Sequence, residues 1–314
     1  MPSSESSNTD DPIAILGPTA SGKSAVAMAV AESDAGRRLG IELVSIDAMQ
    51  VYRGMDVGTA KPTDSDRARV RHHMIDLVDA QENFTVAQFQ AAYRVVVSAI
   101  AKRGGRALLV GGTGLYLRAV VDDLDIPGTW PEIRSRLEEE AQRDGPEQLH
   151  RRLESLDSKA AARMEATNTR RIVRALEVVE GSGRPFSSFG PGVDEYPLAR
   201  VRQVALRWDR DVLRTRIAHR VGVMVESGLV DEVAGLMKTG ISRTARQALG
   251  YKEVIEFLEG QVDLESAVES IVVRTCQFAI RQERWFRRDP RVIWFDVRED
   301  PVDEVAPRII EMLA

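Results

Sequence analysis

The sequence predicts an α/β protein: a parallel sheet that carries a P-loop, is covered by helices and is interrupted by an all-helical insertion domain. Three observations predict this fold class. Residues 17–24 have the spacing G-x-x-x-x-G-K-S, short apolar runs alternate with helical patterns, and strand patterns are missing from 122 to 197. We expect residues 11–121 and 198–314 to form the α/β core, 122–197 to form the helical insertion domain, and 1–10 to be a disordered N-terminus.

The first half of the core alternates strands with helices. Thr85 and Gln88 have the spacing of a capping box, and Gly104 and Gly105 end the helix that this box begins. Because strands that alternate with helices pair in parallel, we expect helices on both faces of the sheet. In order, the patterns predict a strand over 13–16, a helix from Lys23, a strand over 41–47, the helix after Thr85 and a strand over 106–112.

After these elements the pattern is helical from 122 to 197, and strand patterns return from 201 onward. Pro131 suits the first turn of a helix, and Asp157 and Asn168 suit N-cap positions. Residues 181–192 have the composition of a loop. The remaining predicted elements are a strand over 201–208, long helices, a strand over 291–297 and a last helix.

The composition indicates a soluble globular protein. The 314 residues are 43% hydrophobic and 29% charged, with a net charge of −5. No run approaches the roughly 20 apolar residues that cross a bilayer, and the polar start of the chain does not resemble a signal peptide. The single cysteine, Cys276, cannot form an internal disulfide. We therefore expect a cytoplasmic protein with no membrane partner.

The glycine-rich motif predicts a site for a diphosphate or triphosphate. Gly17 and Gly22 permit the backbone angles that let successive N–H groups point at one anion, next to the N-terminus of a helix. Lys23 adds a positive charge, and the hydroxyl of Ser24 is a ligand for Mg²⁺. The motif alone does not distinguish between the two kinds of phosphate.

The position of the nearest acidic residue argues against an ordinary kinase. Such an enzyme has a second strand that ends in a metal-supporting acid, but the strand over 106–112 is followed by Thr113. The acid instead ends the strand over 41–47, as Asp47. Because ligands of open parallel sheets bind beyond the carboxyl ends of the strands, we expect Asp47, Thr113 and the phosphate loop to share one site. From the residues alone, Asp47 is equally a helix cap or a metal ligand.

Seven motifs together resemble those of the tRNA dimethylallyltransferases, also called tRNA isopentenyl transferases, of the bacterial type. They are GPTASGKS, SIDAMQVYRGMDVGTAKP, LLVGGTGLYL, RRIVRALEV, RIAHRV, ALGYKE and RQERWF, in this order between about residues 13 and 295. One position departs from the family, which has serine where this chain has Ala48. A hydrogen bond from that serine hydroxyl is therefore absent.

The resemblance implies transfer of a dimethylallyl group from dimethylallyl diphosphate to the N6 amine of the adenosine that follows the anticodon. Asp47 would be the general base, Thr113 would contact the reacting region, and Arg220 would be a second cation at the diphosphate. Mg²⁺ would bind Ser24 and the diphosphate. The residues implied at the diphosphate are Gly17, Pro18, Thr19, Ala20, Ser21, Gly22, Lys23 and Ser24.

The resemblance also implies a tRNA surface that receives the anticodon stem-loop. The implied residues are Asp47, Ala48, Met49, Gln50, Thr113, Arg134, Arg170, Arg171, Arg174, Arg246, Gln247 and Lys252. Among them, Gln50 can present a donor and an acceptor to a base edge. For the arginines of 170–174, pairing with Glu177 and Glu180 on a solvated face is the alternative. With RNA over much of one face, we expect a monomer.

Three other functions remain open at this point. The same transfer to free AMP or ADP shares the core motifs, and the helical insertion with its arginines is the feature that favours tRNA over it. A small-molecule kinase would turn over ATP without an allyl donor, and a pure binding module would tolerate the loss of Asp47.

Overall fold

The computed structural model describes residues 12–190, 192 and 195–313. The N-terminus predicted to be disordered, 1–10, lies outside the described residues. The described residues divide into two compact units, of which one lies between residues 118 and 197 and the other comprises the rest.

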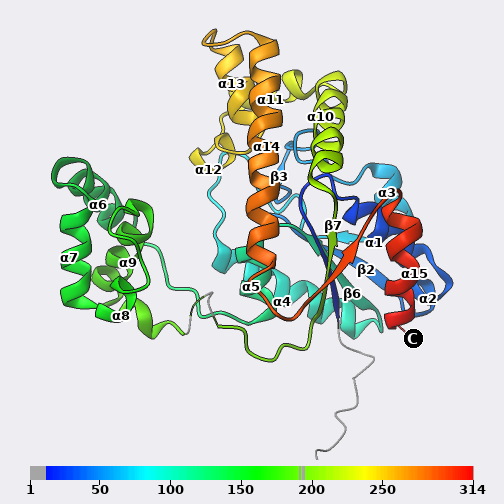
Figure 1. Ribbon diagram of the computed structural model, residues 1–314, viewed down its shortest axis with the longest axis horizontal. Helices are drawn as coiled ribbons and strands as arrows, with labels where there is room; N and C mark the ends of the chain where they lie inside the picture. Colours follow the sequence, from blue (N-terminus) through cyan, green and yellow to red (C-terminus); the bar gives the residue numbers. More distant parts are fainter. Residues whose placement is uncertain (1–11, 191, 193–194, 314) are drawn as a thin grey trace, which may run out of the picture. The chain divides into compact units, whose positions relative to one another are not determined.

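The larger unit is built on a six-stranded sheet with the order β4-β2-β6-β1-β7-β8, in which every pair of neighbours is parallel (Figure 1). This confirms the predicted parallel α/β sheet. Strand β2 ends one residue earlier than predicted, directly before Asp47. The strands are β1 (Ile13–Leu16), β2 (Ile41–Ile46), β4 (His72–His73), β6 (Arg106–Gly111), β7 (Arg202–Arg207) and β8 (Val292–Asp296).

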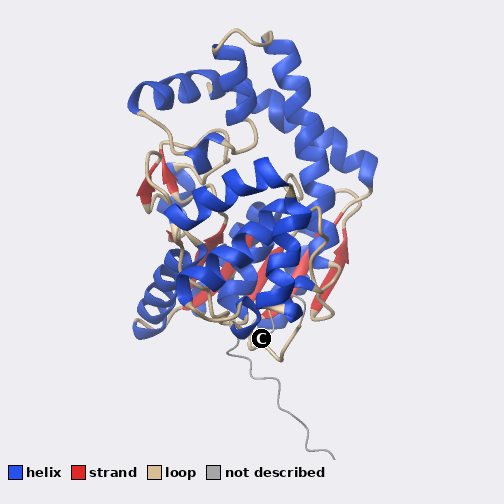
Figure 2. Ribbon diagram, turned by 90° about the vertical axis from the view of Figure 1, so that its left-hand side faces the viewer, coloured by secondary structure: helices blue, strands red, loops and turns tan. Residues whose placement is uncertain are grey.

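The central strands are apolar and buried because helices cover both faces of the sheet, as Figure 2 shows. Helix α1 packs against α15 and β6, and α4 packs against β6. The capping box of Thr85 and Gln88 is present at the start of α4. The helices nearest the sheet are α1 (Lys23–Glu32), α2 (Asp34–Arg38), α3 (Asp64–Arg69), α4 (Val86–Lys102), α5 (Gly114–Val121) and α15 (Pro301–Leu313).

The remaining helices of this unit form a layer in which α14 packs against α10 and α13. They are α10 (Arg210–Glu226), α11 (Leu229–Thr239), α12 (Arg243–Arg246), α13 (Tyr251–Leu258) and α14 (Leu264–Phe286). Two short strands, β3 (Tyr52–Arg53) and β5 (Val78–Asp79), form a separate parallel pair that the sequence did not predict. With two residues each, they are too short to show the alternation of apolar and polar side chains that marks a strand.

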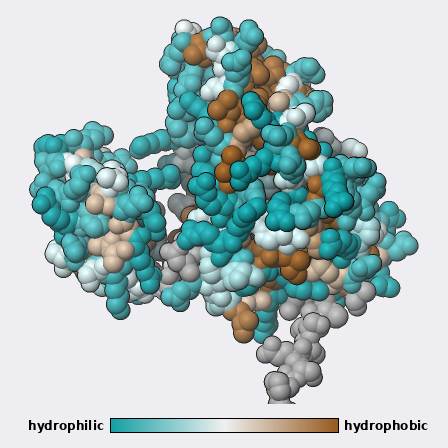
Figure 3. Space-filling model, viewed as in Figure 1, coloured by the Kyte–Doolittle hydropathy of each residue, from teal (hydrophilic) through white to brown (hydrophobic). Residues whose placement is uncertain are grey.

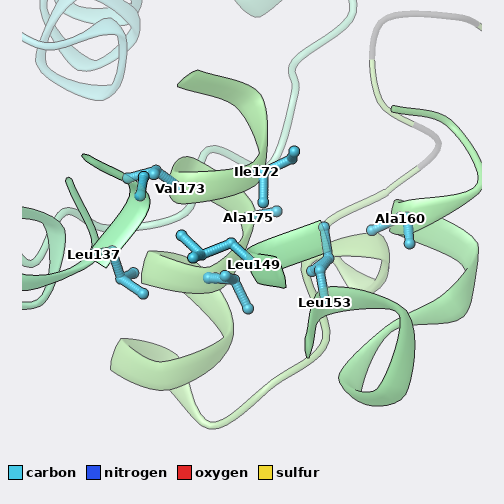
Figure 4. Packing of buried hydrophobic residues seen from close by; sticks show 10 residues of the cluster. Leu137, Leu149, Leu153, Ala160, Ile172, Val173 and Ala175 are labelled. Carbon is cyan, nitrogen blue, oxygen red and sulfur yellow. The ribbon is translucent and has the colours of Figure 1, made fainter. Parts of the chain in front are cut away.

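The smaller unit is helical, with no strand among its described residues. Leucine, isoleucine, valine and alanine side chains from its four helices form one buried cluster, which includes Leu137, Leu149, Leu153 and Ile172 (Figure 4). Asp157 and Asn168 are N-caps, as predicted. The predicted loop over 181–192 contains one 3₁₀ turn, η1 (Phe186–Ser188). The helices are α6 (Pro131–Asp144), α7 (Pro146–Leu156), α8 (Ser158–Ala161) and α9 (Thr169–Ser182).

Within the part of the chain that the structure describes, no helix has both the length and the apolar character that crossing a bilayer requires.

Candidate functional site

A cavity of about 1230 Å³ lies in the larger unit, at the carboxyl ends of the central strands. The phosphate loop between β1 and α1 forms one wall, and the segment after β2, which begins with Asp47, forms another. Helices α10 and α14 contribute Arg216, Arg220, Phe278 and Gln282. The cavity is therefore where an open parallel sheet places its ligand.

The phosphate loop offers four backbone N–H groups that have no partner among the described residues, those of Ala20, Gly22, Lys23 and Ser24. The loop reaches this arrangement with left-handed backbone angles at Ala20 (φ 61°) and Gly22 (φ 88°). Unpaired N–H groups at the N-terminus of a helix form an anion site, because the helix dipole adds to their partial charges. The motif thus has the geometry that its spacing predicts.

Three side chains from distant parts of the sequence hold the loop in this shape. The indole N–H of Trp208 donates to Ser21 O over 2.9 Å, and Arg216 Nε donates to Ala20 O over 3.0 Å. Gln282 Oε1 accepts from the N–H of Thr19 over 2.9 Å. Because C=O and N–H point in opposite directions across a planar peptide, fixing Ser21 O toward Trp208 turns the N–H of Gly22 away from it.

Gln282 also links the loop to the end of the neighbouring strand. Its Nε2 donates to Gly112 O over 2.8 Å. A Cβ atom at position 112 would lie 2.3 Å from that nitrogen, so a side chain there would displace the Gln282 amide. Sequence reasoning missed Trp208 as well as Arg216 and Gln282. The last two lie in the motifs RIAHRV and RQERWF, which was the one available signal.

Three charged groups converge on the phosphate loop. Burial, with the charge of Arg220, lowers the pKa of Lys23 to about 8, while Asp47 acts in the opposite direction. The Lys23 side chain keeps some exposure, but its ammonium is withdrawn from water and donates to Pro18 O over 3.3 Å. Burial also lowers the pKa of Arg220, against the attraction of Asp47. The site therefore holds two cations and one carboxylate within electrostatic reach of one another.

The carboxylate of Asp47 is held by its own loop and keeps one oxygen free. Oδ1 accepts from the N–H of Met49 over 2.8 Å and from that of Gln50 over 3.4 Å. Oδ2 has no hydrogen-bond partner among the described residues. A fixed carboxylate with an unused oxygen that faces a cavity is able to accept a proton from a ligand.

Thr113 lies next to the Asp47 segment, as predicted from the strand ends. Its Oγ1 accepts from the N–H of Ala48 over 3.2 Å, and its own N–H donates to Ile46 O over 3.4 Å. The contact with Ala48 uses the backbone. The structure thus joins Asp47 and Thr113 across neighbouring strands without the serine hydroxyl that the family has at position 48.

Gln50 lines the cavity, but the protein itself occupies both ends of its amide. Oε1 accepts from Ser45 Oγ over 2.8 Å, and Nε2 donates to Thr59 O and Ala60 O over 3.1 and 3.3 Å. The predicted donor to a base edge is therefore engaged. A second lone pair on Oε1 is the capacity that Gln50 retains.

The loop that holds Gln50 is itself fixed by a carboxylate. Glu232 accepts from the N–H groups of Asp56, Val57 and Gly58 over 2.8, 2.7 and 3.2 Å, and from the Tyr251 hydroxyl over 2.6 Å. Three N–H groups on one carboxylate position the carbonyls that bind Gln50.

In the helical unit, two of the predicted tRNA residues have an internal partner. Arg134 and Arg174 both contact the fully buried carboxylate of Glu177, over 2.6 and 3.0 Å, and Glu177 also accepts from the N–H of Trp130. The alternative interpretation named the pairing of Arg174 with Glu177, but on a solvated face, whereas the carboxylate is buried; it did not include Arg134. Glu180 instead binds Arg136 and Arg152. Arg170 and Arg171 are exposed and have no side-chain partner among the described residues.

The other predicted tRNA residues lie in the larger unit. Arg246 contacts Glu259 over 2.5 Å, and Lys252 lies 3.7 Å from Glu256. Gln247 is exposed. The two basic side chains are partly exposed, so their ion pairs are of the weak surface kind.

The residues at the cavity fit a magnesium ion that a diphosphate brings with it. No group of three or more histidine, cysteine, aspartate or glutamate side chains among the described residues could hold a metal without a ligand. Ser24, whose hydroxyl is the metal ligand that the motif predicts, lines the cavity. Hard oxygen donors that leave places for water and phosphate oxygens are the environment that Mg²⁺ prefers.

A phosphate loop at the end of a parallel sheet, opposite a free carboxylate, defines a P-loop protein built to hold a phosphorylated ligand beside a proton acceptor. The sequence pattern of the family "IPP transferase" matches residues 50–289. The chain is 48% identical to a tRNA dimethylallyltransferase of Kineococcus radiotolerans, over 96% of both chains. It is 47% identical to one of Streptomyces coelicolor, over 90% of this chain and 89% of that one. The chain belongs to the IPP transferase family.

A solved structure supports this assignment at the level of the fold. It is the tRNA isopentenylpyrophosphate transferase of Bacillus halodurans, which is 38% identical and has a TM-score of 0.67, with 97% of each chain covered.

Proposed function

We propose that this protein transfers the dimethylallyl group of dimethylallyl diphosphate to the N6 amine of the adenosine adjacent to the anticodon on its 3′ side in tRNA, and releases diphosphate. One observation carries the proposal. Asp47, whose Oδ2 has no partner among the described residues, lines the same cavity as the phosphate loop, Lys23 and Arg220. A leaving diphosphate and a proton acceptor are thereby placed around one reaction volume.

The proposed reaction uses the two sides of the cavity for opposite charges. The C–O bond to the diphosphate breaks, and the negative charge that grows on the departing oxygen is stabilised by Lys23, Arg220 and the four open N–H groups. The adenine nitrogen forms the new C–N bond, and its proton passes to Asp47. The amine is a poor nucleophile, because its lone pair is delocalised into the ring, so the base is needed as the bond forms.

The roles of Thr113 and of the metal complete the proposed site. Thr113 uses its oxygen to accept from the N–H of Ala48, which leaves its O–H free to donate to a ligand. Ser24 is the residue that would hold Mg²⁺ together with the diphosphate. When bound, the ion would add positive charge at the leaving group.

The hydrocarbon part of the donor needs an apolar surface, and the cavity has one. Val223 and Met224 on α10 and Phe278 on α14 line it. Val223 and Met224 lie on the helix that also carries Arg216 and Arg220, so a dimethylallyl tail would contact this apolar surface while its diphosphate binds the loop.

We assign tRNA binding to both units. In the helical unit the exposed Arg170 and Arg171 are the best candidates for phosphate contacts, and the surface drawn in Figure 3 is mostly hydrophilic. In the larger unit, Asp47, Ala48, Met49 and Gln50 would contact the flipped adenosine, which must leave its stack to enter the cavity. The same RNA would meet Arg246, Gln247 and Lys252. For Arg134 and Arg174 we propose an indirect role, through the shape of the helical unit.

Mass analysis of tRNA nucleosides tests the proposal. Unmodified tRNA is incubated with the protein, Mg²⁺ and isotope-labelled dimethylallyl diphosphate, and AMP replaces tRNA in a parallel reaction. We expect labelled dimethylallyladenosine from tRNA only. A labelled product from AMP alone identifies the adenylate transferase, and hydrolysis of ATP in the absence of any allyl donor identifies a kinase. A cytoplasmic location and a monomeric state stay predictions.

A further inference from the structure

Two guanidinium groups, and not one, face the phosphate loop from helix α10. Arg216 and Arg220 are four residues apart and therefore lie on the same side of the helix. Both line the cavity. The family resemblance assigns a role to Arg220, whereas Arg216 enters the argument only through its position here.

Arg216 is held in place by contacts that leave its charged end open. Its guanidinium carbon lies 4.3 Å from the centre of the Trp208 ring, so the two planes are close enough for a cation–π interaction. Nε donates to Ala20 O over 3.0 Å. Neither of the two Nη atoms has a hydrogen-bond acceptor among the described residues. The side chain is thus ordered by two partners that satisfy only one of its donors.

The open end of Arg216 lies near Gly22 of the phosphate loop. Nη2 is 3.7 Å from the place where a Cβ atom at Gly22 would stand. Gly22 is the residue directly before helix α1, and its own N–H has no partner among the described residues. The only acceptor that Arg216 uses is a carbonyl, and no carboxylate pairs with it in the described part of the chain. A partly buried cation without a counter-ion at an anion site is completed by the anion.

We propose that Arg216 is a further leaving-group residue, whose Nη atoms donate to the diphosphate while Trp208 and Ala20 O hold the guanidinium in position. The inference rests on the proposed function in one respect, namely that the anion is a diphosphate that leaves during the reaction. The positive charge of Arg216 would stabilise the same developing negative charge on the diphosphate as Lys23 and Arg220. Trp208 contacts both the loop and the arginine: its indole N–H donates to Ser21 O, and its ring makes the cation–π contact with Arg216.

The test measures inorganic diphosphate binding by calorimetry in the presence of Mg²⁺, which needs neither tRNA nor turnover. Arg216→Gln should weaken binding roughly tenfold to a hundredfold, the loss typical of a charged hydrogen-bond partner. Arg214→Gln is the matched control, since Arg214 is exposed on the same helix and has no side-chain partner among the described residues. It should bind diphosphate like the unchanged protein.

A second variant separates contact with the anion from support of the loop. Arg216→Lys keeps the charge, whereas Arg216→Gln keeps only the ability to donate to Ala20 O. If the charge contacts the diphosphate, the lysine variant binds it more tightly than the glutamine variant. Equal losses in both would assign Arg216 to holding the loop and overturn the proposal, and so would a glutamine variant that binds diphosphate normally.

Steady-state transfer completes the test and keeps the two proposals apart. In an active protein, Arg216→Gln should lower kcat as well as raise the KM for dimethylallyl diphosphate, because the charge grows as the bond breaks. An unchanged kcat contradicts the leaving-group role. If the unchanged protein transfers nothing to tRNA, the proposed function fails, while the diphosphate measurement still decides on Arg216.

Discussion

At the scale of single residues, the proposed reaction separates the group that would remove a proton from the groups that would receive a leaving anion. One oxygen of Asp47 accepts from its own loop, and the other has no partner among the described residues. Lys23 and Arg220 are charged side chains whose pKa values burial lowers. The environments of Asp47 and Lys23 lead to two predictions, each of which compares two closely matched variants.

The first prediction concerns Asp47→Asn. Asparagine can still accept from the N–H groups of Met49 and Gln50 through its oxygen, but it cannot take a proton. We expect transfer to tRNA to fall by at least about a hundredfold, the usual contribution of a general base. The affinity for inorganic diphosphate, measured by calorimetry, should change little. Asp47→Ala removes the turn as well, and a variant of either kind that retains full turnover would rule out catalysis by this carboxylate.

The second prediction concerns the pH dependence set by Lys23. In the free protein its pKa of about 8 means that it loses its charge as the pH rises above 8, whereas a bound anion favours the charged form. The affinity for diphosphate should therefore fall above pH 8, by up to about tenfold per pH unit. Lys23→Arg keeps its charge and is the control, because the titration of diphosphate itself is the same for both proteins. Parallel pH profiles for the two would contradict the lowered pKa.

The lowered pKa of Lys23 affects the stability of the fold in the opposite direction from diphosphate binding. Between pH 8 and 10.5 the unfolded chain keeps a proton on Lys23 that the folded protein has lost. The unfolded state then binds more protons, so the contribution of Lys23 to the free energy of unfolding rises with pH over this range. Between pH 8 and 10.5, the contribution of Lys23 to the free energy of unfolding should therefore increase while the affinity for diphosphate decreases.

At the scale of elements, the helical unit depends on one buried carboxylate. Glu177 on α9 binds Arg134 on α6 and the N–H of Trp130 at the start of that helix, and it also binds Arg174 on its own helix. Burial raises the pKa of Glu177, but the Trp130 N–H and the two arginines outweigh it and hold the pKa below its ordinary value. A carboxylate that joins two helices in this way contributes to the packing of the whole unit.

We predict that Glu177→Ala lowers the free energy of unfolding of the helical unit by about 1 to 3 kcal/mol, since it leaves the Trp130 N–H without its acceptor and removes the carboxylate that Arg134 and Arg174 share. Because the pKa is lowered, the contribution of Glu177 is present above its ordinary value of 4.5 and is lost as the pH falls through the folded value. Chemical denaturation followed by hydrogen exchange of the backbone amides of α6 and α9 measures both effects. Glu154→Ala, at an exposed position on α7, is the control, and an equal loss there would argue against the special role of Glu177.

The sequence predicted those parts of the site that follow from a local motif or from the end of a predicted strand. The loop of 17–24, Asp47 at the end of one strand and Thr113 at the end of the next follow from motif spacing and from the rule for parallel sheets. Trp208, Arg216 and Gln282 could not be found in this way, because their hydrogen bonds span more than 180 residues. Arg134 and Arg174 show the converse limit, since nothing local distinguishes an arginine on RNA from one on a buried glutamate.

At the scale of the whole molecule, the proposed partner is a polyanion although the protein carries a net charge of −5. Attraction to tRNA must then come from local clusters of basic residues, and each phosphate contact releases counterions. We predict that tRNA affinity falls steeply as salt rises, when filter binding or fluorescence anisotropy is measured across a salt series. An affinity that is the same at low and moderate salt would exclude these clusters as the tRNA surface.

Variants of the helical unit locate the contacts in that salt series. Arg170→Ala and Arg171→Ala should each reduce the slope of log K against log salt by about 1, because each removes one phosphate contact. Arg143→Ala is the control, since Arg143 is exposed but paired with Asp144 over 2.8 Å. If only Arg143→Ala changes the slope of log K against log salt, the RNA binds a different face of the helical unit from the one that carries Arg170 and Arg171.

The hydrogen bonds that hold the phosphate loop also bear on the order in which the protein acquires its activity during synthesis. Residues 17–24 emerge from the ribosome before Trp208, Arg216 and Gln282, whose hydrogen bonds to the loop span 187, 196 and 263 residues. A nascent chain therefore has the motif long before it has the side chains that shape it. We expect the loop to reach its anion-binding shape only after helix α14 has been synthesised.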